Sequence, residues 1–412
     1  MSGVGMAISF ASERRRGATP AQLARKVAVR SLKLYALALF LNNGANFEQW
    51  RVIGVLQYFS VSYLIVGACT LDKSPPHRPE PTRQLTLAPN PASNAARTPN
   101  PAQLMEAFLH PSAGEAAEAA AAAPEATALP DSVGEALRLD VFRYGAEWAF
   151  IALLILIYVL VQGLLPLPDG CPTGYIGAGG LADGGKYLGL GCTGGAHRAV
   201  DVALFGVNHI YHDVRDGVAV SSATCSDLYR CDVYDPEGAL GMLSAAFMCF
   251  LGLHAGRVVT TYRHLAAGPG GSKALARPFV ARWLSMGFVL CLAAGALCGF
   301  SKENGVMPIN KNLWSPSFVM LLAGFANIGL SLWFLAIDVW GVLSGAPFIF
   351  MGANSIVIYA GSETFSDYFP FKLSMNGDWQ SHGEALASNI VCVLAWMCVA
   401  RALYVKGIFV NL

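Results

Sequence analysis

The sequence predicts an all-α protein of the membrane: a polytopic transmembrane helix bundle of about eight spans with a disulfide-tied lumenal loop. Of the 412 residues, 54% are hydrophobic and 13% are charged, about half the charged fraction of a soluble domain. Mean hydropathy is +0.45, and apolar runs long enough to cross a bilayer recur along the chain. The net charge of +1 and the lack of a basic run interleaved with aromatic residues exclude nucleic acid as a partner.

The apolar runs give the expected spans in order. Two spans separated only by a short polar turn predict a helical hairpin. The segment 5–12, at the start of the chain, has the composition of the end of a further span. The expected spans are 27–41, 52–71, 148–165, 238–259, 279–300, 318–336, 347–365 and 388–405.

Residues 72–147 differ sharply from the rest of the chain. They are rich in Pro, Ala, Ser and Thr and contain the alanine run 116–123, a composition that predicts a mostly disordered segment, with at most a short helix and without a site. The expected organisation is therefore a first part, 1–71, a cytosolic insertion, 72–147, and a membrane bundle, 148–412. That bundle has lumenal loops at 169–237, 301–316 and 366–387.

Charge predicts the orientation, because Lys and Arg collect on the cytosolic side of membrane proteins. Cations fall at alternate ends of the expected spans, which places both termini and the 72–147 insertion in the cytosol. The cations concerned are Arg14, Arg15, Arg16, Arg25, Lys26, Arg257, Arg263, Lys273, Arg277, Arg282, Arg401 and Lys406.

Four of the ten cysteines, Cys171, Cys192, Cys225 and Cys231, share the loop 169–237 on the opposite side. Disulfides suit a non-cytosolic compartment, so the cysteines agree with the charge argument. Of the three possible pairings, we predict the short-loop one, Cys171–Cys192 with Cys225–Cys231. A zinc site is the open alternative, although the loop has no CxxC motif.

The polar segment 301–315 lies between two expected spans and crowds Asn310, Lys311, Asn312 and Trp314 at a helix end. It is either a binding site or a solvated loop with Trp314 as an interface anchor. Similarly, Asp235 and Glu237 flank Pro236 just before a span. They are either helix-capping residues or carboxylates that bind a sugar and assist a base.

Three further polar residues lie in the expected span 347–365. Asn354 and Ser355 either bond a neighbouring helix or contact a substrate. Glu363 is ionisable near the lumenal end; it is either a functional residue able to pair with Lys311 or Arg51, or a residue without such a role. Arg51 itself is either a flanking cation or part of a site.

Several motifs, taken in order, resemble the heparan-alpha-glucosaminide N-acetyltransferase family. They are RVIGVLQ from Arg51, CPTGYIGAGGLADGGKY from Cys171, YDPEGALG from Tyr234, SKENGVMPINKNLWS from Ser301, GANSIVIYAG from Gly352 and YFPF from Tyr368. The resemblance implies a lysosomal, vacuolar or other endomembrane enzyme that forms a homodimer. It also implies transfer of acetyl from cytosolic acetyl-CoA to a terminal glucosamine of heparan sulfate or a similar glycosaminoglycan or amino sugar.

The resemblance also suggests roles for residues. Arg30, Lys33 and Arg282 are candidates for the phosphates of acetyl-CoA, with flanking positive-inside charge as the alternative reading. The candidates for substrate binding are Arg51, Asn310, Lys311, Asn312, Trp314, Asn354 and Ser355. Asp235, Glu237 and Glu363 are supporting catalytic candidates.

The chain departs from the family pattern at the catalytic residue. The histidine that the family uses lies upstream of the segment with which this chain begins, so the catalytic residue is unknown here. Ser362 stands where the family tends to carry histidine, and Tyr58 stands where a basic residue is expected. Three hypotheses stay open: a shortened version of an active acetyltransferase, a short form that binds acyl-CoA or sugar without turnover, and a membrane transporter.

Overall fold

The structure is a computed structural model that describes residues 2–71, 133–215, 218–221, 230–262, 271–301, 305–366, 368, 370 and 382–410. The chain forms two compact units, and each is described by itself. The first takes in the described residues of 2–71, 133–262 and 277–332. The second unit contains residues 271–276 and the described residues from 333 onward.

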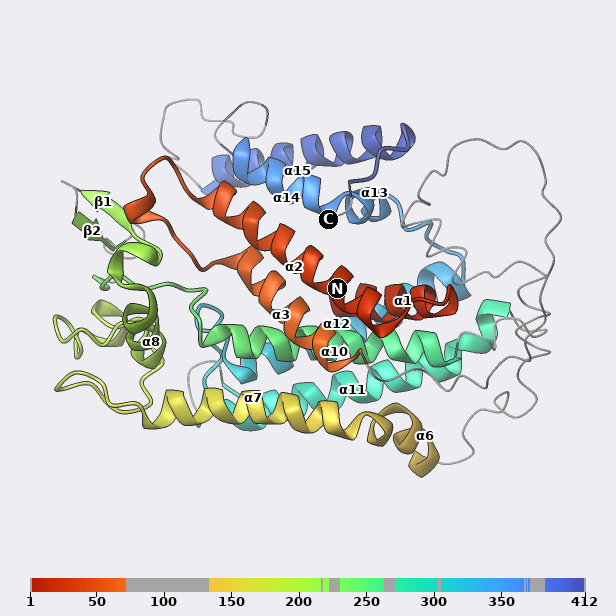
Figure 1. The fold of residues 1–412 in the computed structure, drawn as a ribbon, viewed down its shortest axis with the longest axis horizontal. Coiled ribbons are helices and arrows are strands. Elements are labelled where there is room, and N and C mark those ends of the chain that lie inside the picture. Colours follow the sequence, from red (N-terminus) through yellow and green to blue (C-terminus); the bar gives the residue numbers. More distant parts are fainter. Residues whose placement is uncertain are drawn as a thin grey trace. The chain divides into compact units, whose positions relative to one another are not determined.

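The first unit is helical apart from one short hairpin (Figure 1). Its long helices are α1 (Ser2–Arg15), α2 (Pro20–Asn42), α3 (Val55–Cys69), α7 (Gly145–Leu164), α10 (Gly241–Tyr262), α11 (Ala276–Leu297) and α12 (Pro316–Phe334). Shorter elements are η1 (Phe47–Gln49), α6 (Val133–Asp140), η2 (Phe142–Tyr144), η3 (Leu181–Asp183), α8 (Gly195–Phe205) and η4 (Val207–His209). Strands β1 (Asp213–Arg215) and β2 (Val218–Val220) pair antiparallel, with Val214 opposite Ala219.

Helix α10 is the centre of this unit. It contacts α1, α3 and α7, and 78% of its most apolar window is buried, against 17–33% for the other candidate spans. The seam with α1 is formed by small residues: a Cβ added to Gly3 would lie 2.0 Å from the Cys249 carbonyl oxygen, and one on Gly256 would lie 2.7 Å from Ala7 Cβ. Small residues let membrane helices approach closely enough for their backbones to touch.

The two ends of the first unit differ. The loop with the Cys171–Cys192 disulfide, α8 and the hairpin lie at one end, called here the disulfide end (Figure 1). At the opposite end, Arg14 donates to the carbonyl oxygens of Thr70 and Leu71 after α3.

Among the residues that the structure describes, five helical segments are long and apolar enough to cross a membrane, so the chain is an integral membrane protein. They are Gly134–Leu164, Gly241–Tyr262, Lys273–Leu297, Pro316–Val339 and His382–Val405. This is short of the expected eight, and the difference has local causes. Helix α2 carries four cations, α3 has 15 residues, and the expected span 347–365 is broken.

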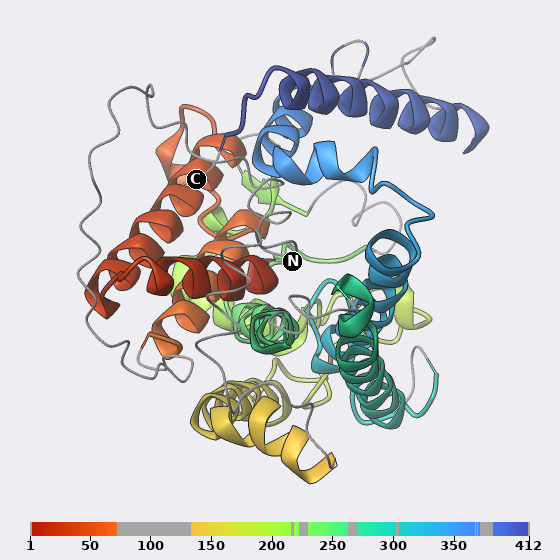
Figure 2. The same cartoon turned by 90° about the vertical axis from the view of Figure 1, so that its right-hand side faces the viewer.

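The second unit contains η6 (Gly271–Leu275), η7 (Leu335–Val339, a π-helix), α13 (Phe348–Ala353), α14 (Ser355–Thr364) and α15 (His382–Val405). Figure 2 shows α13, α14 and α15 in blue. Both α13 and α14 contact α15, and the Gly361 backbone packs against the Trp396 ring. We expected one continuous span at 347–365, and this was wrong: the helix stops at Asn354, whose φ and ψ of −126° and 34° are not helical.

Candidate functional site

The strongest concentration of charge at the disulfide end is the Arg51 cluster, defined as Arg51, Asp235 and Glu237. Arg51 donates through Nε and Nη2 to both oxygens of Asp235, at 2.8 and 2.6 Å. Its Nη2 also binds Glu237 Oε2 at 2.7 Å. Paired donors on a planar guanidinium match the two oxygens of a carboxylate, so the geometry of the first pair is fixed.

The two carboxylates of the Arg51 cluster are held differently. Asp235 is fully buried and also accepts the backbone N–H groups of Tyr211 and Glu237, at 2.8 and 2.9 Å. Glu237 has one contact with Arg51, and its side chain is 20% exposed. Burial raises the pKa of Glu237 and the charge of Asp235 adds to this, while Arg51 and Lys311 act in the opposite direction. Glu237 is therefore the member best placed to meet a ligand and exchange a proton.

Next to the Arg51 cluster, the backbone at the start of α10 is packed so closely that two of its positions have no room for a Cβ atom. A Cβ on Gly238 would lie 2.0 Å from Asp201 Oδ2, and one on Gly241 would lie 2.0 Å from the Tyr58 hydroxyl. That hydroxyl donates to the Gly238 carbonyl oxygen at 2.6 Å. Both glycines of the sequence YDPEGALG are therefore required by this contact.

Asp201, on α8, is a buried carboxyl beside the cluster. Its Oδ1 accepts the Ala239 N–H at 2.7 Å, while Oδ2 has no hydrogen-bond partner among the described residues. Burial raises the pKa of Asp201 to about 7, the charge of Asp235 adds to this, and the Ala239 N–H opposes it. Asp201 is thus an ionisable group in the neutral range at the edge of the site.

The loop before α12 closes the site from another side. The Asn310 side chain donates to the Ile176 carbonyl oxygen at 2.6 Å and accepts the Leu313 N–H, so it organises the loop. The Asn312 amide reaches the Tyr234 hydroxyl at 3.2 Å, and the Trp314 ring packs edge-on against Tyr58 at 5.0 Å. Lys311 lies close enough to Glu237 to act on its pKa. The structure thus brings the 310–314 residues to the Arg51 cluster.

A buried histidine joins the same loop to α7 and α8. The His197 ring lies 3.0 Å from the Tyr158 hydroxyl, which donates to the Leu313 carbonyl oxygen at 3.0 Å. Burial lowers the pKa of His197 to about 3, so the ring is neutral. Because its side chain is only 1% exposed, we interpret His197 as a structural support for the loop and not as a group that contacts substrate.

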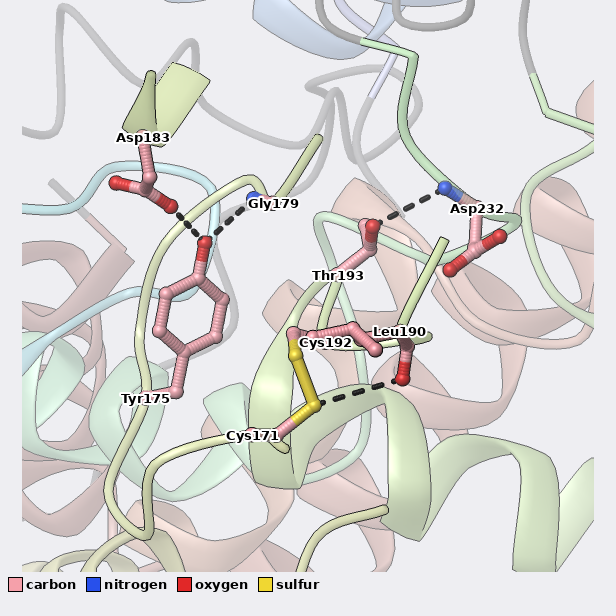
Figure 3. The surroundings of a disulfide bond; sticks show 8 residues. All are labelled: Cys171, Tyr175, Gly179, Asp183, Leu190, Cys192, Thr193 and Asp232. Atoms are coloured by element: carbon pink, nitrogen blue, oxygen red, sulfur yellow. Dashed lines mark hydrogen bonds between the residues drawn. A yellow bond between two sulfur atoms is a disulfide. The ribbon is translucent and has the colours of Figure 1, made fainter. Parts of the chain in front are cut away.

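The glycine-rich loop forms the outer frame (Figure 3). The predicted Cys171–Cys192 disulfide is confirmed. Tyr175 is held between the Asp183 carboxylate and the Gly179 N–H, and Thr193 accepts the Asp232 N–H at 3.1 Å. Cys231 is disulfide-bonded, but Cys225 lies outside the described residues, so the second predicted pairing stays a prediction. In the described part of the chain, no group of three or more His, Cys, Asp or Glu could hold a metal ion.

The three candidates for phosphate binding are not gathered at one point. Arg282 is bound to Asp140 and to the Tyr262 hydroxyl, the latter at 2.7 Å. On α2, Arg30 lies 4.8 Å from the centre of the Tyr63 ring, and Lys33 is exposed. A hollow of about 310 Å³ lies at the α1–α2 turn, away from the Arg51 cluster, and contains the 2.6 Å pair of Lys26 with Glu13.

Three candidates belong to the second unit. Asn354 is fully buried; its amide donates to the Ile408 carbonyl oxygen at 3.0 Å and accepts the Val410 N–H at 3.1 Å. Ser355 begins α14 and Glu363 lies near its end, exposed. Glu363 belongs to the second unit, and Lys311 and Arg51 belong to the first, so their pairing stays a prediction.

Sequence reasoning missed several residues that the structure places beside the Arg51 cluster. Asp201 stands in α8 with His197 and Arg198, Gln57 ends the motif RVIGVLQ, and Tyr211 comes just before the short hairpin. The charges of Asp201, Asp235 and Glu237 all act on the Tyr58 hydroxyl, which shows that these groups lie close together. The RVIGVLQ motif itself was the available signal for Gln57.

No protein-family model matches the chain. The chain is 39% identical over 271 residues to two proteins named heparan-alpha-glucosaminide N-acetyltransferase, from Homo sapiens and Mus musculus. The matched region is 66% of this chain, 37% of the human protein and 38% of the mouse protein. The chain thus spans less than half the length of these relatives.

Proposed function

Because the chain belongs to the heparan-alpha-glucosaminide N-acetyltransferase family, we propose that it is a transmembrane N-acetyltransferase. The donor is acetyl-CoA from the cytosol, and the acceptor is a terminal glucosamine of heparan sulfate or of a similar lumenal glycan. The names of the relatives support a glucosamine acceptor, and acetyl-CoA supplies the activated acetyl group as its thioester.

The Arg51 cluster carries this proposal. An amino sugar enters as an ammonium ion, and the two carboxylates of the Arg51 cluster attract it, while Lys311 offsets part of that attraction. Glu237 is the partly exposed carboxylate, and its raised pKa makes it a better proton acceptor than an ordinary surface glutamate. Asp235 keeps Arg51 in place, because the buried pair has two direct bonds.

The proton balance assigns a role to Glu237. It accepts one proton from the ammonium group, which leaves a neutral nitrogen with a free electron pair. That nitrogen attacks the acetyl carbonyl carbon, so a C–N bond forms and the C–S bond of the thioester breaks. The second proton lost from nitrogen goes to the departing sulfur, and the products are an acetamide, a free thiol and one proton on Glu237.

The donor side is proposed from charge. The exposed Lys33 and the half-buried Arg30 are the proposed contacts of the acetyl-CoA phosphates. Arg282 is paired with Asp140 in this structure. It contacts a phosphate only if the phosphate replaces Asp140. Both termini are proposed to lie in the cytosol, in a lysosomal, vacuolar or other endomembrane, with the enzyme as a homodimer.

The remaining acceptor contacts are proposed from position. Lys311, Asn312 and Trp314 surround the Arg51 cluster and suit the sugar hydroxyls and ring face, while Asn310 shapes their loop. Substrate contacts by Asn354, Ser355 and Glu363, in the second unit, stay a prediction from the sequence. Asn354 has to release the 408–410 backbone to take part.

The test is acetyl transfer by this chain in sealed vesicles, with labelled acetyl-CoA on one side and a glucosaminide on the other. Glu237→Gln keeps the shape but removes the base, and we expect at least about 100-fold less transfer. The matched control is Glu13→Gln, which removes an ion-paired carboxylate near the α1–α2 turn and should leave transfer unchanged.

Equal transfer by Glu237→Gln and the unaltered protein would contradict the proposal. Binding of sugar without any transfer would point to the binding-only hypothesis. Sugar accumulation without acetylation would point to the transporter hypothesis.

A further inference from the structure

Gln57, in the first turn of α3, is a fully buried side chain whose bonding is incomplete. Its exposure is 0%, and neither Oε1 nor Nε2 has a hydrogen-bond partner among the described residues. A primary amide offers two N–H donors and two acceptor lone pairs. Buried amides almost always use them, so an unpaired one requires an explanation.

The Gln57 amide lies beside the Arg51 cluster. A Cβ placed on Gly54 would lie 3.1 Å from Gln57 Oε1 and 3.5 Å from the Arg51 guanidinium carbon. The same point lies 3.2 Å from Asn42 Nδ2, so the Gln57 amide, the Asn42 amide and the guanidinium surround the Gly54 backbone. The next residue, Tyr58, binds the Gly238 carbonyl oxygen, which fixes this turn of α3 against the start of α10.

Glu237 is the more weakly held carboxylate of the Arg51 cluster. It is held by one bond to Arg51, whereas Asp235 is held by two and by two backbone N–H groups. Displacement of Glu237 from Arg51 by an incoming ammonium group therefore breaks fewer bonds than displacement of Asp235 would, and it frees the guanidinium that neighbours Gln57.

The ligand class follows from the hydrogen-bonding pattern of an amide. Its oxygen and nitrogen lie side by side, so it matches a partner that presents a donor and an acceptor on adjacent atoms. An acetamido group does not, because the N–H and C=O of a trans amide point in opposite directions. A sugar amine and the hydroxyl on the next ring carbon do match the amide, because they present a donor and an acceptor side by side.

We propose that Gln57 is a specificity-determining residue that recognises the amine and the adjacent C3 hydroxyl of the acceptor amino sugar. Oε1 accepts from the amine and Nε2 donates to the C3 oxygen. This inference rests on the proposed acceptor site, and it adds the reason that an amine without a neighbouring hydroxyl is rejected.

The experiment is a double-mutant cycle in binding, which needs no turnover. The probes are methyl α-D-glucosaminide and its 3-deoxy analogue, and the dissociation constants are measured on protein in lipid nanodiscs. For the unaltered protein we expect the 3-deoxy sugar to bind about 10- to 100-fold more weakly. Leucine has a side chain of similar volume, so in Gln57→Leu the ratio of the two dissociation constants should fall to about 1.

Two further variants separate recognition from folding. Gln57→Glu keeps the acceptor oxygens but loses the N–H donors when ionised, so it should also lose the preference for the C3 hydroxyl. Gln162→Leu removes another buried glutamine, 3% exposed on α7, and should keep the preference.

The outcomes distinguish the two proposals. If the unaltered protein binds neither sugar, the acceptor site itself is wrong. If it binds glucosaminide but Gln57→Leu keeps the full preference for the C3 hydroxyl, the role of Gln57 is wrong and the acceptor site stands.

Discussion

Asp201 makes the stability of the disulfide end dependent on pH. Because burial raises its folded pKa from 3.8 to about 7, the folded state binds this proton more tightly than the unfolded chain does. The stability contributed by this carboxyl is therefore complete below about pH 4 and is lost as pH rises through 7. Near pH 8 we expect Asp201→Asn to be more stable than the unaltered protein, by about 2–4 kcal/mol.

Thermal melting between pH 4 and 8 measures this effect, and the curve for Asp201→Asn should be flatter. The exposed Asp169→Asn is the control, and its melting curve should follow that of the unaltered protein. Parallel curves for Asp201→Asn and the unaltered protein would show that this carboxyl does not titrate in the range.

Gly238 has no room for a side chain, since a Cβ there would meet Asp201 Oδ2 at 2.0 Å. We expect Gly238→Ala to destabilise the protein by about 1–3 kcal/mol, because either Asp201 or the Tyr58 contact has to move. The control is Gly44→Ala, where nothing lies within 4 Å of the added Cβ. A melting temperature for Gly238→Ala equal to that of Gly44→Ala contradicts the packing.

At the level of single residues, the sequence singled out Arg51, Asp235 and Glu237 but not Asp201 or Gln57. Arg51, Asp235 and Glu237 each stand next to a span, where a charge is conspicuous. Asp201 and Gln57 became important only through contacts between distant segments, such as the Asp201 bond to Ala239. Local sequence carries no sign of such contacts.

At the level of elements, hydropathy predicted where helices occur better than where they end. Expected spans 238–259 and 279–300 correspond to α10 and α11 within a few residues. The span 347–365 failed because Asn354 bonds the backbone at 408 and 410 in place of continuing the helix. Hydropathy averages over such a residue, since one polar side chain changes the mean of a window very little.

The close contact between α1 and α10 can be tested by a substitution. Gly256→Leu places a large side chain where Ala7 and the Val4 backbone are in contact, so the two helices should separate. We expect at least about 2 kcal/mol of destabilisation and faster proteolysis at the α1–α2 turn. Gly5→Leu, on α1 and with open space around its Cβ, is the control and should change neither the stability nor the rate of proteolysis. Unchanged proteolysis of Gly256→Leu is the contrary result.

For the whole molecule, the distribution of charge and the positions of the cysteines together predict the membrane topology, that is, which loops are lumenal and which are cytosolic. Asn310 lies at the disulfide end and Arg277 at the start of α11. In sealed vesicles, Asn310→Cys should react with an impermeant thiol reagent only from the lumenal side, and Arg277→Cys only from the cytosolic side. Labelling of both from one side would reverse the predicted topology.

The packing of α1 on α10 also has a consequence for biosynthesis. Ser2 bonds Cys249, a partner 247 residues later in the chain. At about 5–20 residues per second, the first helix waits for roughly 12–50 s before its main partner leaves the ribosome. Throughout that interval its glycine face has no helix to cover it. Nascent chains arrested before α10 are accordingly the form of this protein most dependent on chaperones and most exposed to quality-control proteases.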